Sequence, residues 1–425
     1  MNSYGTILTE KVIYTLSQPL KPVVYILAED LEDGVSLSFV NESSKAEYTV
    51  AATQSSPEVS SFVDSTQEPQ RSNSSVSVEQ WKKTKSAEEL KKLTPGFDNR
   101  GCHCFANAAL KQLILNSKGY VAEHYNVPDF AKDLAKAFQD LNQSFYDCRE
   151  GKGDQKTVTA ARTKLIKSIE NLSRTQIPGL DGNEEVALEY LKEQFKSYGG
   201  QEDDAHIFAD AICQLCGLIE PENTLHIHHV YPLVQSWQGK TQIESDGIDN
   251  GSYFSIDPDG EDLPTILSSQ LESTDETKVD VLNDADEKIT LEARHKLSSN
   301  RCDDCKSLQS LRIQAKIFLG KDSRKITGAK ALLTDNDDQI NVILGDKNSE
   351  FNCLQFSIRS VVCHSGGKTV NSGHYITLEN LGNGDWLVHS DHQTSTFKGN
   401  LRKFFATYPD MLPYLFDLKK SEDNL

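Results

Sequence analysis

The clearest regular pattern of apolar and polar positions lies towards the C-terminal end of the chain. Over residues 354–362, alternate positions carry bulky apolar side chains, with Ser360 as the exception, as on one face of a β-strand. A second alternating run starts at His374 and is followed by Asn383-Gly384, a two-residue signal for a tight turn. Folding back at that turn makes residues 386–391 antiparallel to this run. The pattern therefore predicts a hairpin that brings position 391 within a residue or two of His374.

Apolar residues recur at helical spacing in three other segments, which predicts three helices. One starts at residue 104 or 105, and the others cover residues 130–145 and 186–198. The last two stripes are typical of core packing, and no cofactor role is expected for them. A helical half followed by a β-rich half predicts an α+β fold.

The composition changes along the chain and predicts three regions. Residues 1–50 contain short strand-like runs and are expected to form a small or poorly ordered N-terminal segment, because fifty residues support only a marginal core. Residues 51–88 are expected to form a disordered linker, since nine serines occur between residues 51 and 80 with few bulky apolar residues. Residues 89–425 are then expected to form the main domain, which is long enough for ample core.

The net charge of the chain is −19, from 44 basic and 63 acidic residues. This balance argues against nucleic acid as the main partner, because phosphate binding needs a basic face. Nine cysteines, an odd number, give no disulfide framework and favour a reducing compartment. The sequence contains no run of about 18 apolar residues that would predict a membrane span, and no secretory signal is visible. A cytoplasmic protein is expected; a pathogen protein delivered into a host cytosol by another signal would look the same.

Cys104 lies where a glycine-containing loop runs into the first predicted helix. The dipole at a helix N-terminus favours a thiolate, and backbone N–H groups there, with the side chain of Asn99, can stabilise an oxyanion. On this segment alone, a buried structural cysteine is the better interpretation. Together with His374 as a base and Asp391 to hold that base, Cys104 completes the set of groups that a cysteine hydrolase needs.

Four blocks in this order resemble the ubiquitin-specific protease (USP, peptidase C19) family. Residues 96–112 resemble its Cys box, and His374-Tyr375 with Asp391 resemble its His box. Between them, residues 204–208 resemble the start of a family helix, and residues 311–330 more weakly resemble a family strand and the segment after it. The resemblance covers residues 94–415 and identifies the chain as a divergent member.

The resemblance implies a papain-like cysteine protease fold of USP type, with a helical thumb, a β-rich palm and fingers, and an N-terminal extension. It implies a thiol-dependent deubiquitinase that hydrolyses the isopeptide or peptide bond after the C-terminal glycine of ubiquitin or a ubiquitin-like modifier. The expected partners are this modifier and its conjugates. The implied catalytic residues are Cys104 as nucleophile, His374 as base, Asp391 to orient His374, and Asn99 as an oxyanion donor. The implied substrate-binding residues are Asp204, Glu202, Gly373 and Tyr375.

Two pairs of residues depart from the family pattern. Cys102-His103 replace the usual Asn-Thr and give two candidate thiols, of which the register with Asn99 favours Cys104. Glu202-Asp203 replace two glutamines. The resemblance implies that Asp204 meets an arginine of the ubiquitin tail, and an extra acid nearby suits that contact.

Many USP-like enzymes hold a zinc ion between two Cys-x-x-Cys pairs, and this chain also has two such pairs. Cys302 and Cys305 lie closer to the following strand than the family spacing, whereas Cys213 and Cys216 fall in a helical pattern typical of core. A structural zinc site needs four ligands, and only one plausible half-site is present. No zinc and no other cofactor is therefore expected.

Two other interpretations stay open at the level of sequence. A USP-like pseudoprotease would bind ubiquitin as a scaffold with weak catalysis, although all three triad members are present. A papain-like hydrolase would act on a substrate unrelated to ubiquitin, although the block at Asp204 favours a ubiquitin-like tail.

Overall fold

The computed structural model describes a chain that groups into two compact units. One unit comprises residues 1–73, 228–247 and 272–298, and the other comprises residues 74–227, 248–271 and 299–425. The predicted boundaries at residues 50 and 88 stay predictions. The described residues are 12–13, 24–31, 34–41, 46–51, 85–99, 103–175, 177, 182–194, 204–219, 227–238, 240–249, 252–272, 274–282, 288–298, 308–319, 323–324, 326–333, 340–343, 353–366, 372–382 and 384–421.

The first unit is built on an eight-stranded sheet with the order β4-β3-β2-β1-β8-β9-β5-β6. Strand β1 joins the N-terminal strands to the rest by antiparallel pairing with β8, in which Val12 lies opposite Val281. The strand-like runs of the N-terminal segment therefore extend a larger sheet and need no core of their own. The strands are β1 (Val12–Ile13), β2 (Val24–Leu31), β3 (Gly34–Asn41), β4 (Ala46–Ala51), β5 (Ile227–Trp237), β6 (Lys240–Asp249), β8 (Thr274–Leu282) and β9 (Lys288–Ser298).

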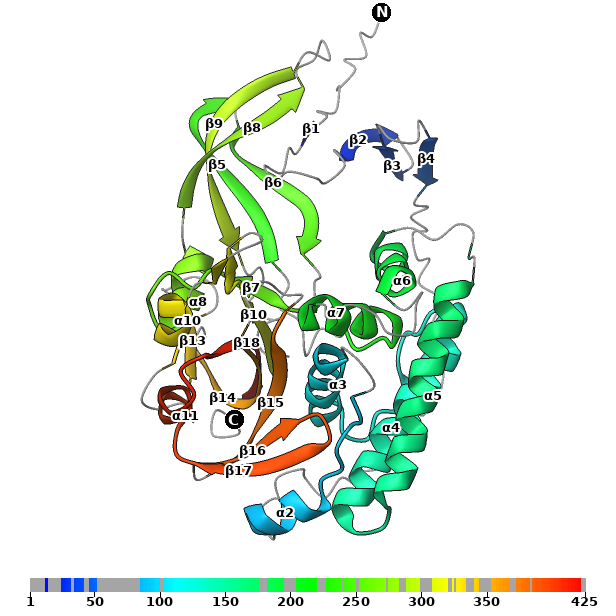
Figure 1. The fold of residues 1–425 in the computed structure, drawn as a ribbon. Coiled ribbons are helices and arrows are strands. Elements are labelled where there is room, and N and C mark those ends of the chain that lie inside the picture. Colours follow the sequence, from blue (N-terminus) through cyan, green and yellow to red (C-terminus); the bar gives the residue numbers. More distant parts are fainter. Residues whose placement is uncertain are drawn as a thin grey trace, which may run out of the picture. The chain divides into compact units, whose positions relative to one another are not determined.

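The second unit contains a helical part with helix α3 (Cys104–Asn116) at its centre. Helix α3 begins at Cys104, as predicted, and is buried on all sides from residue 104 to residue 115. Figure 1 shows α3 between the sheet of this unit and the helices α4 and α5. The predicted helix over residues 130–145 is α4, which ends at Gly151 in the left-handed conformation (φ 79°). The other helices are α2 (Ala87–Leu93), α4 (Lys132–Glu150), α5 (Gln155–Arg174), α6 (Gly182–Gln194), α7 (Ala205–Leu215), α8 (Leu263–Glu272), α10 (Ile326–Ala331), α11 (Leu401–Thr407) and the short 3₁₀ turns η1 (Ala122–His124) and η2 (Asp129–Ala131).

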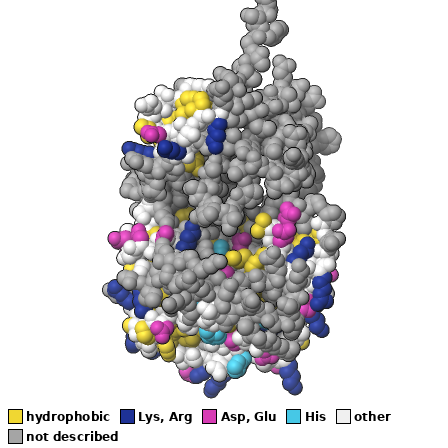
Figure 2. Space-filling model, turned by 45° about the horizontal axis from the view of Figure 1, so that its top comes forward, with side chains coloured by type: hydrophobic (Ala, Val, Ile, Leu, Met, Phe, Trp, Pro, Cys, Tyr) yellow, Lys and Arg dark blue, Asp and Glu magenta, His cyan; other side chains and the backbone are white. Residues whose placement is uncertain are grey.

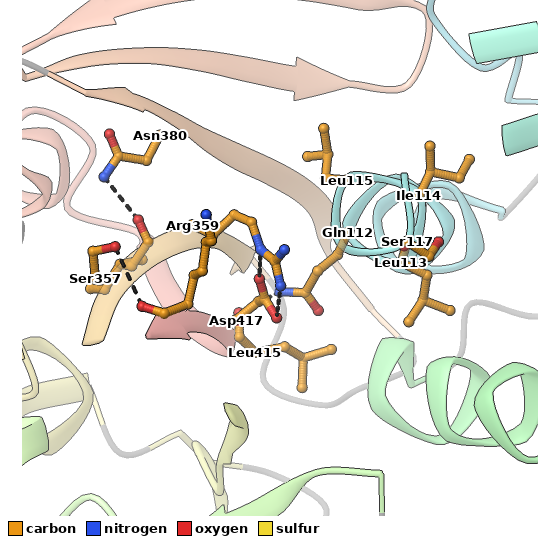
Figure 3. Close-up of polar contacts among 12 residues, drawn as sticks. Gln112, Leu113, Ile114, Leu115, Ser117, Ser357, Arg359, Asn380, Leu415 and Asp417 are labelled. Atoms are coloured by element: carbon orange, nitrogen blue, oxygen red, sulfur yellow. Dashed lines mark hydrogen bonds and ion pairs between the residues drawn. The ribbon is translucent and has the colours of Figure 1, made fainter. Parts of the chain in front are cut away.

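The sheet of the second unit has the order β17-β16-β15-β14-β18-β10-β7, with β13 paired to β14. Strands β15 and β16 form the predicted hairpin, with Thr377 opposite His389. An ion pair between Arg359 on β14 and Asp417 on β18 cross-links neighbouring strands (Figure 3). The strands are β7 (Phe254–Ile256), β10 (Ser310–Ala315), β13 (Ile340–Ile343), β14 (Cys353–Ser365), β15 (His374–Gly382), β16 (Asp385–Ser390), β17 (Gln393–Lys398) and β18 (Met411–Lys420), and β11 (Phe318–Leu319) with β12 (Ser323–Arg324) form a separate ribbon.

Hydrogen bonds fasten α3 to this sheet at two heights. Thr377 Oγ1 on β15 donates to the Ala108 carbonyl at 2.9 Å. One turn further along the helix, Gln112 Nε2 donates to the Leu415 carbonyl on β18 at 3.1 Å (Figure 3). Buried hydrogen bonds of this kind fix the position of a helix, because breaking one leaves a polar group without a partner and away from water. The start of α3 is thus held at a fixed place beside the β15–β16 hairpin.

Four ionisable side chains are buried between α3, α4 and the hairpin. Arg149 Nη1 donates to both carboxylate oxygens of Glu379, at 3.1 and 3.0 Å, and both side chains are fully buried. His389 Nε2 bonds the same carboxylate at 3.2 Å. Lys111 Nζ donates to the Pro95 carbonyl at 2.6 Å, and burial lowers the pKa of Lys111 well below its usual value. Removing one partner of such a network is costly, because it leaves a buried group without its bond.

The buried His389 makes the stability of the fold depend on pH. Burial lowers the pKa of His389 from 6.5 to about 4, although the bond to Glu379 opposes this shift. Between these two values the unfolded chain binds a proton that the folded protein does not, so the free energy of unfolding decreases as the pH falls from 6.5 to about 4. The expected loss from this group is roughly 3 kcal/mol. Urea unfolding of wild type and His389→Gln at pH 7 and pH 4 measures it, and an equal loss in both proteins would contradict the assignment.

Exposed acidic and basic side chains are interspersed over the face drawn in Figure 2. Among the described residues of that face, the net negative charge is therefore not gathered into one patch. Among the residues with described side chains, the large exposed hydrophobic ones are Val186, Ile207, Val234 and Tyr408. Within the described ranges, no helix combines the length and the apolar character needed to cross a membrane.

Candidate active site

Cys104 is the first residue of α3, and its side chain is 2 % exposed. The N-cap, His103, provides no side-chain cap. The loop before it instead folds back through Asn99, whose Oδ1 accepts a hydrogen bond from the His103 backbone N–H at 3.1 Å. The positive end of the helix dipole lies at this thiol, where it stabilises a thiolate.

His374 is the first residue of β15, and it follows Gly373, which has φ 122°. A Cβ at position 373 would overlap with the Ser365 carbonyl and lie 2.7 Å from His364 Nε2, so backbone packing alone requires a glycine. His374 Nε2 lies 2.8 Å from Oγ of Ser390, the last residue of β16. This hydrogen bond occupies Nε2, so Nδ1 is the nitrogen that can act as a base.

Asp391 lies in the turn after β16 and has φ 50°, a left-handed conformation that aspartate tolerates better than most residues. Its Oδ2 accepts a hydrogen bond from Asn99 Nδ2 at 3.0 Å, and its Oδ1 accepts one from Asn107 Nδ2 at 2.7 Å. Its backbone carbonyl accepts a third from the Phe97 N–H at 2.9 Å. These contacts fasten the segment that precedes Cys104. The hydrogen bond to His374 that the sequence assigned to Asp391 is made in the structure by Ser390.

Further polar contacts extend from Asp391 through Asn107 to helix α5. Arg162 on α5 donates from Nε and Nη2 to Asn107 Oδ1, at 2.9 and 2.6 Å. Burial lowers the pKa of His103, and Arg162 lowers it further, while Asp391 acts in the opposite direction. Neither Arg162 nor Ser390 is predicted from the sequence, and Asn107 is marked only as a position in register with the Cys box. No local pattern marks Arg162.

Gly96 brings the loop into direct contact with the turn that holds Asp391. A Cβ at position 96 would overlap with the His392 carbonyl, so a larger residue would push the two segments apart. Gln155 holds both backbone polar groups of Gly96: its Oε1 accepts from the Gly96 N–H at 3.0 Å, and its Nε2 donates to the Gly96 carbonyl at 2.8 Å. The segment before Cys104 and the end of the hairpin are thus packed against each other.

Asp204 is the N-cap of α7 and is 8 % exposed. Its Oδ1 accepts hydrogen bonds from the His206 backbone N–H at 2.7 Å and from the Tyr414 hydroxyl at 2.6 Å. Oδ2 takes part in neither bond, so it is the oxygen that can meet a cation. Glu202, the neighbouring predicted residue, lies outside the described residues.

Tyr375 is 2 % exposed and belongs to an aromatic cluster between His374 and Asp204. Its ring centroid lies 4.7 Å from that of His364 and 6.2 Å from that of Tyr414, the residue that bonds Asp204. The cluster therefore connects the hairpin to the start of α7. The substrate contacts predicted for Tyr375 and Gly373 stay predictions.

The cysteines at positions 213 and 216 are core residues. Both are fully buried, and burial raises the pKa of each thiol. Arg312 Nη1 contacts Cys213 Sγ at 3.5 Å. Among the residues that the structure describes, no group of three or more His, Cys, Asp or Glu side chains could hold a metal ion. Cys102, Cys302 and Cys305 lie outside those residues.

Comparison with known proteins identifies the family. The model of the family described as ubiquitin carboxyl-terminal hydrolase matches residues 95–414. The fold is similar to the Ubp8/Sgf11/Sus1/Sgf73 deubiquitinase module of SAGA bound to ubiquitin aldehyde, with a TM-score of 0.52 and 17 % identity over 79 % of this chain and 71 % of that chain. It is also similar to the Ubp8 module bound to monoubiquitin, with a TM-score of 0.51 and 16 % identity over 79 % and 70 % of the two chains. No curated protein sequence shows significant similarity.

The structural likeness confirms the α+β, papain-like fold of USP type that the sequence predicts. The family match covers the helix that starts at Cys104, the hairpin that carries His374, and everything between them. The chain therefore belongs to the ubiquitin carboxyl-terminal hydrolase family, and it is a deubiquitinase that acts as a cysteine protease.

Proposed function

We propose that this enzyme cleaves the isopeptide or peptide bond after the C-terminal glycine of ubiquitin, with Cys104 as nucleophile and His374 as base. One observation carries the assignment of residues. Asn99 and Asn107, on either side of Cys104, both bond Asp391, and the adjacent Ser390 bonds His374. Hydrogen bonds between segments almost three hundred residues apart support their assignment to one site. The similar Ubp8 modules that bind ubiquitin support ubiquitin as the modifier.

The proposed reaction proceeds by acyl transfer to the thiol. His374 Nδ1 takes the thiol proton, and the Cys104 thiolate attacks the glycine carbonyl to give a tetrahedral oxyanion. The imidazolium then protonates the lysine amine as the C–N bond breaks, which leaves a thioester on Cys104. A water molecule, deprotonated by His374, attacks the thioester and releases the ubiquitin carboxylate and the thiol.

Asn99 is proposed as a donor to the oxyanion. Its Nδ2 carries two N–H groups, of which one bonds Asp391 and the other remains available to a substrate. Its Oδ1 is held by the His103 backbone N–H, so the amide cannot rotate without losing a bond. A donor fixed before the reaction starts is what stabilises developing charge efficiently.

Asp204 is proposed to bind a basic residue in the tail of the modifier. Its hydrogen bonds with His206 and Tyr414 use only Oδ1, and the charge is therefore held in place without being neutralised. A fixed carboxylate is well suited to an arginine, whose fork of donors matches it.

The variant Asp204→Asn should isolate this charge. Asparagine is an equally good N-cap and can still accept the Tyr414 hydroxyl, so the fold should be unaffected. KM for a fluorogenic ubiquitin substrate is expected to rise about tenfold, with kcat within about threefold of wild type. Glu189→Gln, which removes an exposed acid of α6, is the matched control. An unchanged KM in Asp204→Asn would place the basic tail elsewhere.

The proposed function is tested by labelling with ubiquitin that carries a thiol-reactive C-terminal group, followed by intact mass. Wild type and Cys102→Ala are expected to gain the mass of one ubiquitin, and Cys104→Ala is not. Parallel labelling with probes built on ubiquitin-like modifiers tests whether one of these is the substrate. An adduct with one of those and none with ubiquitin would reject ubiquitin as the modifier.

A further inference from the structure

The hydrogen bond from His374 Nε2 to Ser390 Oγ gives the base a neutral partner where the sequence suggested a carboxylate. We propose that Ser390 is the residue that positions His374, and that Asp391 instead holds the oxyanion loop through Asn99 and Asn107. The catalytic role of this hydrogen bond rests on the proposed function, whereas the hydrogen bond itself is observed independently of that function.

The register of the hairpin explains why Ser390 and not Asp391 reaches the base. Thr377 lies opposite His389 in the β15–β16 ladder. Continued by one residue, this register places Ser390 opposite Ile376, on the same face as His374. Position 391 would lie opposite Tyr375 and hence on the other face, because successive side chains of a strand alternate. A side chain at 390 is thus the diagonal neighbour of His374, within reach of a hydrogen bond.

Asp391 is also not available to replace Ser390. Both of its carboxylate oxygens accept amide donors, and its backbone carbonyl accepts the Phe97 N–H. Arg162 donates twice to Asn107 Oδ1, so the Asn107 amide is fixed with its Nδ2 towards Asp391. Turning Asp391 towards His374 would break both hydrogen bonds and take the carboxylate away from the buried amide of Asn107.

The direction of the bond to Ser390 follows from the role of His374. A general base needs an unprotonated Nδ1, and the neutral ring then carries its proton on Nε2, which donates to Ser390 Oγ. A hydroxyl aligns the ring in this way but adds no negative charge to stabilise the imidazolium. Among the described residues, the titratable or charged groups near this end of the hairpin include Cys104 and its neighbour His103, Arg162 from α5, His364 from β14, and Asp391 and His392 from the turn.

The test measures how fast Cys104 is alkylated by iodoacetamide as a function of pH, followed on the Cys104 peptide by mass spectrometry. Alkylation reports the thiolate that His374 maintains and needs no ubiquitin. Ser390→Ala is expected to slow alkylation at neutral pH about tenfold, since one neutral hydrogen bond to the base is lost. Ser390→Asp, which adds a charge beside the imidazolium, should extend fast alkylation to lower pH, because a stabilised imidazolium favours the thiolate.

Matched variants separate positioning from packing. Ser390→Thr keeps the hydroxyl and Ser390→Val has nearly the same shape without it, so alkylation should stay close to wild type in the first and fall in the second. This pair carries the test even if Ser390→Ala unfolds more easily. Ser395→Ala, at an exposed serine of β17, is the control and should leave the profile unchanged. Equal profiles for Ser390→Thr and Ser390→Val would overturn the proposal.

Failure of the proposed function would be recognised separately. If wild type is not labelled by the ubiquitin probe while alkylation still depends on the hydroxyl at position 390, the substrate assignment falls and the role of Ser390 stands. If wild type is labelled while alkylation is indifferent to position 390, the role of Ser390 falls and the function stands.

Discussion

Replacing Cys104 by alanine should abolish hydrolysis while leaving ubiquitin binding intact. The thiol is the only atom group that forms the covalent intermediate in the proposed reaction, and kcat is expected to fall by at least about 10⁴-fold. Binding should persist, because the tail contacts proposed for Asp204 lie at the start of another helix, α7. Turnover of a fluorogenic ubiquitin substrate and the Kd for ubiquitin by calorimetry measure the two effects. A Kd within about threefold of wild type is expected.

A second cysteine provides the matched control for this variant. Cys148 on α4 is also buried, and burial raises the pKa of its thiol, which makes it unreactive. Cys148→Ala should therefore retain turnover although it removes a comparable side chain. Cys102→Ala should retain it too. Activity that survives in Cys104→Ala and disappears in Cys102→Ala would move the nucleophile by two residues.

Replacing Asp391 by asparagine should lower kcat by about 10²-fold. Asp391 holds the amide of Asn99, the proposed oxyanion donor, and this loss is the typical cost of disturbing one preorganised donor. From sequence alone this change looks mild, since an amide could still orient His374. The structure changes that expectation. The two carboxylate oxygens accept from two amide nitrogens, and an asparagine at position 391 would turn its own NH₂ group towards one of them.

Neither neighbouring amide can rotate to relieve this conflict. Asn107 Oδ1 is held by two donors of Arg162, and Asn99 Oδ1 is held by the His103 N–H. Asparagine tolerates the φ of 50° as well as aspartate does, so the variant isolates the hydrogen bonds from backbone strain.

Steady-state kinetics with the fluorogenic substrate measure the effect of Asp391→Asn. Asp385→Asn, at the other end of β16, removes a carboxylate that pairs with Lys398 at 4.0 Å on the surface. It is expected to stay within about twofold of wild type, because such pairs contribute little. Wild-type kcat in Asp391→Asn would show that the loop before Cys104 does not depend on this carboxylate.

Local patterns were sufficient for the elements that carry the site. The apolar stripe after Cys104 predicted the start of α3, and the structure begins the helix at that residue. Alternation and the turn signal at residues 383–384 predicted the hairpin of β15 and β16. Both predictions succeed because helix periodicity, strand alternation and turn chemistry are properties of neighbouring residues. The order of the family blocks added the fold and the protease activity.

The partner of His374 could not be fixed in the same way. The sequence placed position 391 within a residue or two of His374, but a shift of one residue in a strand moves a side chain to the opposite face. Only the register of the ladder, with Thr377 opposite His389, puts Ser390 on the face of the base. The same limit applies to the N-terminal strands, whose pairing with β8 joins residues far apart in the chain.

The chain thus encodes locally where the helix begins, where the hairpin turns and which residue types carry thiol chemistry. Tertiary structure decides which of these groups bond one another. Arg162 shows this most clearly: it fixes the Asn107 amide from a separate helix, and through it the carboxylate of Asp391. No periodicity or motif marks such a residue, because its role arises only when α3, α5 and the end of β16 pack together and their polar groups must be satisfied away from water.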